Sequence, residues 1–572
     1  MRQTLHGQGA SRGIALGRAR VRLPHALQIA EQRIPPEAVD AELAQLHGAI
    51  ASVRAEMHAL RARLHGALAA EVGEFLDMHA LLLDDPELLQ GLDALVRERH
   101  FSADYALRLQ RDRLAGVFEA MDDPYFRSRV EDIDQVIGRI HAALHRRDCE
   151  LRGFAGEVLV AESVAPAEMA QLRDQGVVAI VTTGGSPLSH SAILARSLHL
   201  PLVVDATQAL ELINDGDALI VDGGSGRVVV EPDADDLRRH RAREREHARE
   251  RRELARLRRE PTRTRDGVDV RLFANAESRE DVAEAYALGA AGIGLYRTEF
   301  LFLQRNTLPD EDEQFRAYRD VVMGMNDRPV TIRTLDVGAD KVDRTGLALR
   351  DEPNPALGLR GVRLSLARRG LLHTQLRALL RASAYGRIRL LVPMVTCREE
   401  ILEVRAEIAN ATQALRLDGH EIADDVPLGV MIEVPAAALA LPAFVRDVDF
   451  IALGTNDLVQ YLLATDRNHE GLGRLYTPLH PAVIRVLRDV IRIARRASRP
   501  VSVCGEMAAA PDYAPLLLAL GLTDFSLHPG TMLEVRQRIR NCDFAALQAR
   551  ASALVRARDR RALEQWLATA HG

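Results

Sequence analysis

Polar residues follow a series of short apolar segments in the second half of the chain, each at the point where a segment ends. They are Arg297 and Glu299 after GIGLY, Arg333 and Asp336 in TIRTLD, Glu433 after GVMI, Asn456 and Asp457 in IALGTND, Arg467 shortly after, and Cys504 and Glu506 in VSVCGE. A single carboxylate is usually a solvated or paired surface group. Recurrence at matching positions predicts instead that these side chains share one site.

The residue types in this set indicate what such a site would bind. Its three arginines carry planar guanidinium groups that suit carboxylate and phosphate oxygens. Glu433 and Asp457 suit Mg²⁺, which takes one or two protein carboxylates and leaves positions for substrate oxygens. The set therefore predicts a Mg²⁺-dependent site for a small phosphorylated carboxylate.

A second candidate site lies in GGSPLSHSAILAR, residues 184–196. A glycine-rich turn leads through Ser189 and His190 into SAILARSL, which has the pattern of a helix. Backbone N–H groups at a helix N-terminus favour a phosphoryl group, and an imidazole can act as a nucleophile. An isolated Ser-His pair is more often a cap or a loop, so the candidate depends on the rest of the chain.

The elements that must position the first set alternate regularly after Pro261. The expected strands are VRLFANA, GIGLYRT, VTIRTLDVG, RLLVPMV, LGVMIEVP, DFIALGTND, VSVCGEM and DFSLHPG. Helical segments separate nearly all of them, and eight such units over roughly 310 residues are typical of a TIM barrel. The alternation is also compatible with a doubly wound open sheet. In a barrel, the strand ends converge on one mouth, where active sites lie.

The first part of the chain contains two kinds of sequence pattern. Short β-branched segments such as EVLVAES, GVVAIVTT and ALIVDG indicate an α/β domain, which we expect the opening SRGIALGRARVRL to join. Between them, apolar residues from Leu43 to Leu64 recur at spacings of three and four, which predicts an inserted helical bundle. Residues 233–260 form a highly charged run of mixed sign that favours a solvated linker helix over a nucleic-acid-binding stripe.

Composition excludes several classes of protein. The chain has 572 residues, 47% of them hydrophobic and 27% charged, with a net charge of −6, so a generally basic nucleic-acid-binding protein is not expected. Its four cysteines form no C-x-x-C pair, which argues against a disulfide framework or a zinc site built on cysteine pairs. Neither an N-terminal apolar segment nor a stretch of 18 apolar residues occurs, so we expect a cytoplasmic protein with no membrane span.

Taken together, the motifs resemble the enzyme I family of the bacterial phosphotransferase system, the phosphoenolpyruvate–protein phosphotransferases. The resemblance covers essentially the whole chain. It is carried by HALLLDDPEL, SHSAILARS, GIGLYRTEFLF, TIRTLDVGADK, EPNPALGLRG, MIEVPAAA, GTNDLVQY, DRN and CGEMA. Pyruvate phosphate dikinase and phosphoenolpyruvate synthase share the phosphohistidine domain and the barrel, but they add a large ATP-grasp domain for which this chain has no room.

The resemblance implies an α/β multidomain fold with four parts. These are a swivelling phosphohistidine domain (1–24 and 146–230), a helical insertion that docks the phosphocarrier protein HPr (25–145), a linker helix (231–261) and a phosphoenolpyruvate-binding TIM barrel (262–572). It also implies a homodimer formed through the barrel. The activity implied is transfer of the phosphoryl group of phosphoenolpyruvate to the enzyme and then to a histidine of HPr, with release of pyruvate, as the first step of sugar phosphotransfer.

The resemblance also assigns roles to individual residues. His190 matches the phosphorylated histidine and Cys504 the proton donor, whereas the other three cysteines keep the simpler interpretation of inert thiols. Glu433 and Asp457 match the Mg²⁺ ligands. The residues that match phosphoenolpyruvate-binding positions are Arg297, Arg333, Lys341, Asn456, Asp457 and Arg467. Lys341 is the only lysine beside 74 arginines, which suggests that a compact ammonium is needed there.

The chain departs from the family pattern at a few positions. Ser186 and Leu188 stand where glycine and threonine are usual before the histidine, and His528 and Pro529 replace small residues at the eighth strand. Two other functions remain open at this point. One is a dikinase-like fragment that passes phosphate to a separate nucleotide-binding subunit, and the other is a non-enzymatic regulator that binds phosphoenolpyruvate as a signal.

Overall fold

The computed structural model divides the chain into two compact units, Met1–Ala248 and Arg249–Gly572, each with its own hydrophobic core. The division falls inside the charged helix predicted from the sequence. The structure describes residues 2–22, 31–63, 79–119, 129–145, 155–164, 166–187, 189–198, 200–302, 307–338, 352, 354–466, 472 and 475–570.

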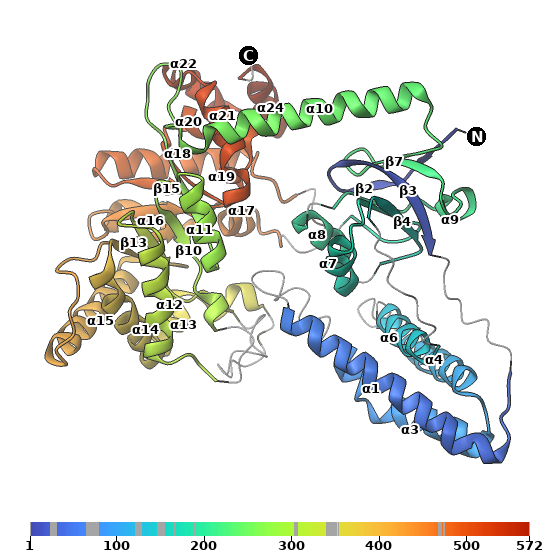
Figure 1. The fold of residues 1–572 in the computed structure, drawn as a ribbon. Coiled ribbons are helices and arrows are strands. Elements are labelled where there is room, and N and C mark those ends of the chain that lie inside the picture. The colour runs from blue at the N-terminus through green and yellow to red at the C-terminus, as the bar shows by residue number, and fades with distance from the viewer. Residues whose placement is uncertain are drawn as a thin grey trace. The chain divides into compact units, whose positions relative to one another are not determined.

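The first unit contains an eight-stranded mixed sheet with the order β1-β8-β7-β3-β4-β5-β6-β2 (Figure 1). Its strands are β1 (Gln3–His6), β2 (Gln8–Ser11), β3 (Ile14–Arg22), β4 (Glu157–Ala161), β5 (Ala179–Thr182), β6 (Leu202–Val204), β7 (Ala218–Asp222) and β8 (Arg227–Val230). Strand β3 pairs parallel with β4 and antiparallel with β7. The opening segment therefore joins the later sheet, as the sequence predicts. Three helices connect the later strands: α7 (Pro166–Asp174), α8 (His190–Ser197) and α9 (Ala209–Leu212).

The segment between β3 and β4 is helical. Its helices are α1 (Val39–Arg63), α3 (Pro86–Arg99), α4 (Ala103–Glu119) and α6 (Arg129–Leu144), and they lie side by side in Figure 1. Helix α1 buries the described part of the predicted stripe, because residues three and four apart share one face of a helix. The buried residues are Leu43, Leu46, Ile50, Val53 and Met57, whereas Leu64 lies outside the described residues. The predicted helical insertion is confirmed.

Helix α10 (Ala234–Arg256) follows the sheet and continues into the short 3₁₀ helix η2 (Leu257–Arg259). Most of its described side chains are exposed, as the mixed charges predict. Its first turn is held by Asp236, whose buried carboxylate accepts hydrogen bonds from Arg2 at 2.6 Å and Arg239 at 2.8 Å. The start of α10 is thus held against the sheet of the first unit.

The second unit is a closed barrel of eight parallel strands, so the open-sheet alternative is wrong. The strands are β9 (Arg271–Ala276), β10 (Ile293–Tyr296), β11 (Val330–Arg333), β12 (Ile388–Val392), β13 (Leu428–Ile432), β14 (Phe450–Leu453), β15 (Val501–Val503) and β16 (Asp524–Leu527). Each strand predicted from the sequence is present. Pairing of β16 with β9, from Asp524–Arg271 to Leu527–Ala274, closes the barrel.

Helices surround these strands in the alternation that the sequence predicts (Figure 1). They are α11 (Arg279–Ala287), α12 (Glu311–Gly324), α13 (Val362–Ala367), α14 (Arg369–Ala382), α15 (Arg398–Leu417), α16 (Pro435–Phe444), α17 (Thr455–Leu463), α18 (Pro481–Arg496), α19 (Glu506–Ala509), α20 (Ala514–Leu520), α21 (Met532–Arg540), α22 (Phe544–Ala549), α23 (Ala551–Arg556) and α24 (Arg560–Thr569). No helix within the described ranges has the length and apolar character needed to cross a bilayer.

Side chains fill the barrel interior. A small cluster of buried residues includes Leu295, Leu391, Met431 and Phe450 from different strands, together with Cys504 at the end of β15. A Cβ atom at Gly429 would lie only 2.4 Å from the ring of Phe450, so glycine is required there to make room for the aromatic side chain. The packed interior leaves the strand ends as the place for a ligand.

A buried arginine holds in place the segment that precedes the first barrel strand. Arg536 of α21 donates hydrogen bonds to Thr262 Oγ1 at 3.0 Å and to the carbonyl oxygens of Leu257 and Arg258 at 2.5 and 2.8 Å. A methionine would leave these acceptors without their donor, and a buried polar group without a partner costs about 1–3 kcal/mol. We expect Arg536→Met to lower the free energy of unfolding of the second unit by about 2–4 kcal/mol.

Urea unfolding followed by tryptophan fluorescence measures this effect, because Trp566 of α24 is the only tryptophan in the sequence and reports on the second unit. Arg561→Met, at an exposed position of α24 in the same unit, is the matched control and is expected to change the free energy of unfolding by less than about 0.5 kcal/mol. Equal unfolding midpoints for the two variants would contradict the role of Arg536.

Candidate active site

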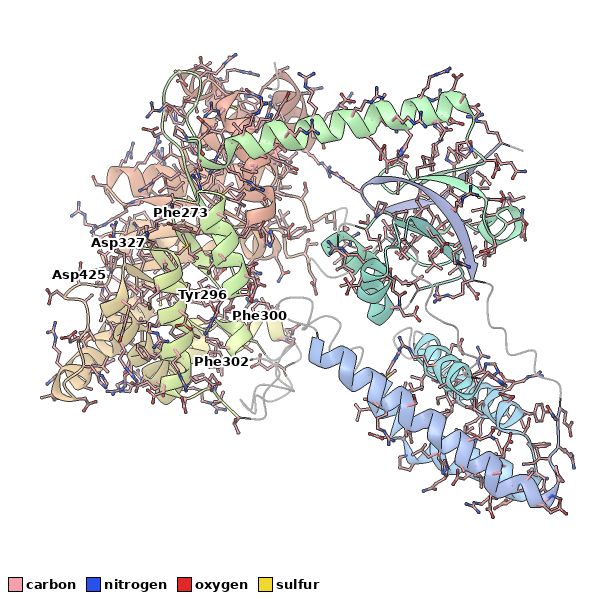
Figure 2. All side chains as sticks on the ribbon, in the orientation of Figure 1. Phe273, Tyr296, Phe300, Phe302, Asp327 and Asp425 are labelled. Atoms are coloured by element: carbon pink, nitrogen blue, oxygen red, sulfur yellow. The ribbon has the colours of Figure 1, made fainter. Side chains whose placement is uncertain are left out.

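A pocket lies at the carboxyl ends of the barrel strands. It is lined by Leu295, Arg297, Glu299, Phe300, Arg333, Asp336, Arg360, Met431, Glu433, Gly454, Asn456, Asp457, Cys504 and Gly505. Figure 2 labels Tyr296, the last residue of β10, and Phe300, which lies in the short 3₁₀ helix η3 (Glu299–Leu301) that follows after two intervening residues. The lining includes eight of the strand-end residues predicted from the sequence, and they come from five different strand ends.

Arg333 forms the charged centre of the pocket. At the end of β11, its guanidinium lies 3.0 Å from Glu299 Oε1 and 3.0 Å from Asp336 Oδ2. Burial disfavours the charged form, but these two carboxylates outweigh that effect and raise the pKa of Arg333 above its ordinary value. Arg333 is therefore a permanently charged group held in a fixed orientation.

Arg360 is a second guanidinium in the pocket. It forms a bidentate ion pair with Asp336, in which Nε lies 3.2 Å from Oδ1 and Nη2 lies 3.0 Å from Oδ2. Its Nη2 also lies 3.3 Å from Asp457 Oδ2. Its Nη1 donates to the hydroxyl oxygen of Tyr461 at 3.2 Å. Burial opposes the charge of Arg360, but Asp336 and Asp457 raise its pKa above the ordinary value. Asp336 thus bridges the two arginines.

Glu433 is a buried carboxylate that follows β13. Its Oε1 accepts a hydrogen bond from the backbone N–H of Met394 at 2.7 Å. Burial, and then repulsion from Asp336 and Asp457, raises the pKa of Glu433 to about 8. The backbone approaches this carboxylate closely, since a Cβ atom at Gly454 would lie 2.8 Å from Glu433 Oε2. Burial and the neighbouring carboxylates therefore disfavour the ionised form of Glu433.

Cys504 follows β15 and is buried against the barrel interior. Its thiol donates a hydrogen bond to the carbonyl oxygen of Leu453 at 3.3 Å. Burial, and then the Glu433 carboxylate, raises the pKa of Cys504 to about 12. The sulfur therefore carries its proton at neutral pH, which is the form needed to donate a proton. Cys397 and Cys542, the other cysteines that the structure describes, lie outside the pocket lining.

Asn456 and Asp457 lie in the first turn of α17. Asn456 is oriented from both sides of its amide, because its Nδ2 donates to Glu506 Oε1 at 3.2 Å and its Oδ1 accepts from the backbone N–H of Glu506 at 2.8 Å. The backbone carbonyl of Asn456 also accepts from Tyr476 at 3.2 Å. The strand end that carries Cys504 thus positions the residue at the start of α17.

Arg297 lies at the rim of the pocket and is the most exposed of its arginines. Its side chain pairs with Glu277, which follows β9. With 41% of its side chain exposed, Arg297 is far more accessible than Arg333, whose side chain is 11% exposed. Arg297 is therefore the guanidinium of the pocket that is most accessible from solvent.

His190 belongs to the first unit, where it is the first residue of α8. Ser189 caps this helix by accepting a hydrogen bond from the N–H of Ala192 at 3.3 Å. The backbone of His190 is described, but its side chain is not among the described ones. Gly185 adopts the left-handed conformation, with φ of +98°, in the preceding turn. Ser186 does not, so serine at that position introduces no backbone strain.

Three predicted positions cannot be placed. Lys341, Arg467 and Leu188 lie outside the described residues. Their roles remain predictions from the sequence.

Sequence reasoning assigned no role to Arg360. Its signal was present in EPNPALGLRG, which carried part of the family resemblance, but Arg360 follows no predicted strand and so did not fit the rule of polar strand ends. It stands just before α13, and Gly361 beside it takes a left-handed conformation with φ of +58°. Phe300 and Met431 were also unassigned, because apolar residues at these positions are expected in any barrel core.

Comparison with known families identifies the parts of the chain. A family described as "PEP-utilising enzyme, PEP-binding domain" matches residues 251–544, which contain the barrel and its pocket. "PEP-utilising enzyme, N-terminal" matches residues 6–129, and "PEP-utilising enzyme, mobile domain" matches residues 154–226, which contain His190. The predicted class, an α/β multidomain protein with a mobile domain, a helical insertion and a C-terminal TIM barrel, is confirmed.

Curated relatives extend the match to nearly the full chain. Phosphoenolpyruvate-protein phosphotransferase of Cupriavidus necator is 44% identical over 94% of both chains. The proteins of the same name from Geobacillus stearothermophilus and Staphylococcus aureus are 40% identical (94% of this chain, 93% of the relative) and 36% identical (94% of both). The chain belongs to the phosphoenolpyruvate-protein phosphotransferases, a family of enzymes, and the resemblance found in the sequence is confirmed.

Proposed function

We propose that the chain transfers the phosphoryl group of phosphoenolpyruvate to its own His190 and then to a histidine of the phosphocarrier protein HPr, releasing pyruvate. This is the first step of sugar phosphotransfer. The observation that carries the proposal is the pocket at the barrel mouth, where Arg333, Arg360 and Cys504 converge in a family whose relatives bear the name of this activity. HPr and pyruvate follow from the family resemblance.

The pocket suits a small, highly charged substrate. Arg297, Arg333 and Arg360 line it and offer planar donors for phosphate and carboxylate oxygens. The carboxylate partners of Arg333 and Arg360 hold both guanidinium groups in place before substrate arrives, so little reorganisation is needed at the moment of reaction. We propose that Lys341 and Arg467 complete the set, as the sequence predicts.

The pocket also fits a Mg²⁺ ion, which Glu433 and Asp457 would hold. Its lining has one more carboxylate than guanidinium group, and burial, followed by repulsion from Asp336 and Asp457, raises the pKa of Glu433. A divalent cation held there would favour the ionised form of Glu433 and would add positive charge for an anionic substrate. When bound, Mg²⁺ supplies positive charge for substrate oxygens.

The first half-reaction then uses groups of both units. An imidazole nitrogen of His190 attacks the phosphorus atom, and the bond from phosphorus to the enol oxygen breaks. Arg297 and Arg333 stabilise the negative charge on the group in transfer, with Arg360 beside them. The thiol of Cys504 gives its proton to the methylene carbon of the enolate, which yields pyruvate, and the thiolate regains a proton from water.

The second half-reaction requires that the phosphohistidine reach the acceptor. We propose that the helical insertion, residues 25–145, docks HPr, that residues 1–24 and 146–230 form the domain that carries His190, and that the linker (231–261) permits it to leave the barrel (262–572). A homodimer formed through the barrel is also proposed, from the family resemblance. Transfer between two imidazoles needs little beyond alignment.

Labelled phosphoenolpyruvate tests this function. Incubation of the full chain with phosphoenolpyruvate labelled in its phosphate, Mg²⁺ and HPr is expected to give acid-labile label on the chain that moves to HPr, because a phosphorus–nitrogen bond is acid-labile. His190→Ala is expected to abolish the label. His420→Ala, an exposed histidine of the barrel unit, is the matched control and should label normally.

Each other outcome identifies an alternative. Label that forms on His190 but does not move to HPr would indicate a dikinase-like fragment with another acceptor. Binding of phosphoenolpyruvate without any label on the wild-type chain would indicate a regulator and would overturn the proposed function.

A further inference from the structure

A cluster of metal-ligating side chains lies in the helical insertion, in the first unit and apart from the barrel pocket. Asp104 stands in the first turn of α4, and His141 stands in the last turn of α6, with His145 immediately beyond it. One potential ligand atom from each side chain lies within 4.8 Å of the other two. None of these residues is used in the proposed phosphotransfer.

The geometry brings both imidazoles to one carboxylate oxygen. His145 Nε2 lies 2.6 Å from Asp104 Oδ1, and His141 Nε2 lies 3.4 Å from the same atom. The two histidines are four residues apart, a spacing that places two imidazoles on one helix face, and their ring centroids lie 4.6 Å apart. Two ligand atoms bound tetrahedrally to zinc at 2.0–2.1 Å are separated by about 3.3 Å, so modest side-chain movement suffices.

The simplest alternative is charge pairing between helix ends. An aspartate near a helix N-terminus and a histidine near a C-terminus are each favoured by the helix dipole. That explanation requires only one histidine. A single histidine is also enough for another imidazole–carboxylate pair of the helical insertion, in which His47 Nε2 lies 2.7 Å from Asp93 Oδ1. A second imidazole directed at the same carboxylate oxygen adds a third ligand, which charge pairing does not need.

We propose that Asp104, His141 and His145 form a binding site for a divalent transition-metal ion of the zinc class. Two imidazoles and one carboxylate are a ligand set that Zn²⁺ accepts, whereas Mg²⁺ prefers oxygen ligands alone. The metal takes the place of hydrogen on both Nε2 atoms, and the remaining ring proton of each neutral imidazole stays on Nδ1. His145 is 54% exposed, so the ion can enter from solvent and keep water at its open position.

Zinc binding by the full chain tests the site. Equilibrium dialysis with Zn²⁺, in excess Mg²⁺ so that the barrel carboxylates are occupied, is expected to show one more zinc ion per wild-type chain than per His145→Gln chain. Loss of one of three ligands is expected to weaken zinc binding at this site by roughly 100-fold. Removal of a residue that only hydrogen-bonds to a metal ligand already lowers metal affinity by up to about 100-fold. His141→Gln and Asp104→Asn should behave like His145→Gln.

His47→Gln is the matched control, because it breaks a comparable imidazole–carboxylate pair in the same helical insertion without removing a proposed ligand. It should bind zinc like the wild type. Circular dichroism establishes that each variant keeps its helices. Co²⁺ titration gives a second readout, since visible absorption typical of low-coordinate cobalt is expected for the wild type and His47→Gln but not for His145→Gln. Equal zinc stoichiometry and affinity in the wild type and His145→Gln would overturn the proposal.

Discussion

Arg333→Leu is expected to abolish measurable phosphotransfer and to destabilise the second unit by about 3–5 kcal/mol. Arg333 is buried between Glu299 and Asp336, at 3.0 Å from each. Leucine leaves Glu299 without this guanidinium and leaves Asp336 paired with Arg360 alone. Removal of one partner from a buried ion pair exposes the full cost of the other buried charge. Loss of an arginine that faces a transferring phosphoryl group costs about 10³- to 10⁵-fold in rate.

Two further variants separate folding from chemistry. Arg333→Lys keeps a positive charge but loses the planar fork, so we expect it to recover much of the stability while the rate stays strongly reduced. Arg446→Leu, at an exposed position of the same unit, is the surface control, with an expected change below about 0.5 kcal/mol. Urea unfolding monitored through Trp566 and labelling of His190 are the two measurements. An Arg333→Leu chain that is as stable and as active as Arg446→Leu would contradict this role.

Cys504→Ala is expected to lower the rate of pyruvate formation by about 10²- to 10⁴-fold, the usual contribution of a positioned general acid. The thiol carries its proton at neutral pH because its pKa is raised to about 12. Since Cys504 contributes little to charge in the pocket, we expect KM for phosphoenolpyruvate to change far less than kcat. The same pattern would not arise if the thiol only packed against its neighbours.

Steady-state assay of pyruvate gives kcat and KM for this comparison. Cys397→Ala is the matched control, since Cys397 lies at the start of α15 outside the pocket lining and is expected to leave both constants unchanged. A Cys504→Ala enzyme with turnover close to that of Cys397→Ala would show that the enolate receives its proton from another group.

Much of the fold could be predicted from the sequence, because the signals that specify it are local. The strands of the barrel are short apolar segments such as FIAL and LGVMI, which are buried on both faces and are therefore apolar throughout. The stripe of α1 follows from helix geometry. Closure into a barrel is different, since it depends on the pairing of β16 with β9 across more than half of the second unit, which alternation alone does not require.

In the candidate site, too, some features follow from the local sequence and others only from the tertiary structure. The sequence by itself determined which residue types stand at the strand ends, and it placed His190 at the start of a helix after a glycine turn. Only the tertiary structure decided that Arg360 pairs with Asp336 and Asp457, because that contact joins a loop to two separate strand ends. It also decided that Cys504 holds its proton, since burial raises a thiol pKa and burial is a property of the packed barrel rather than of any segment.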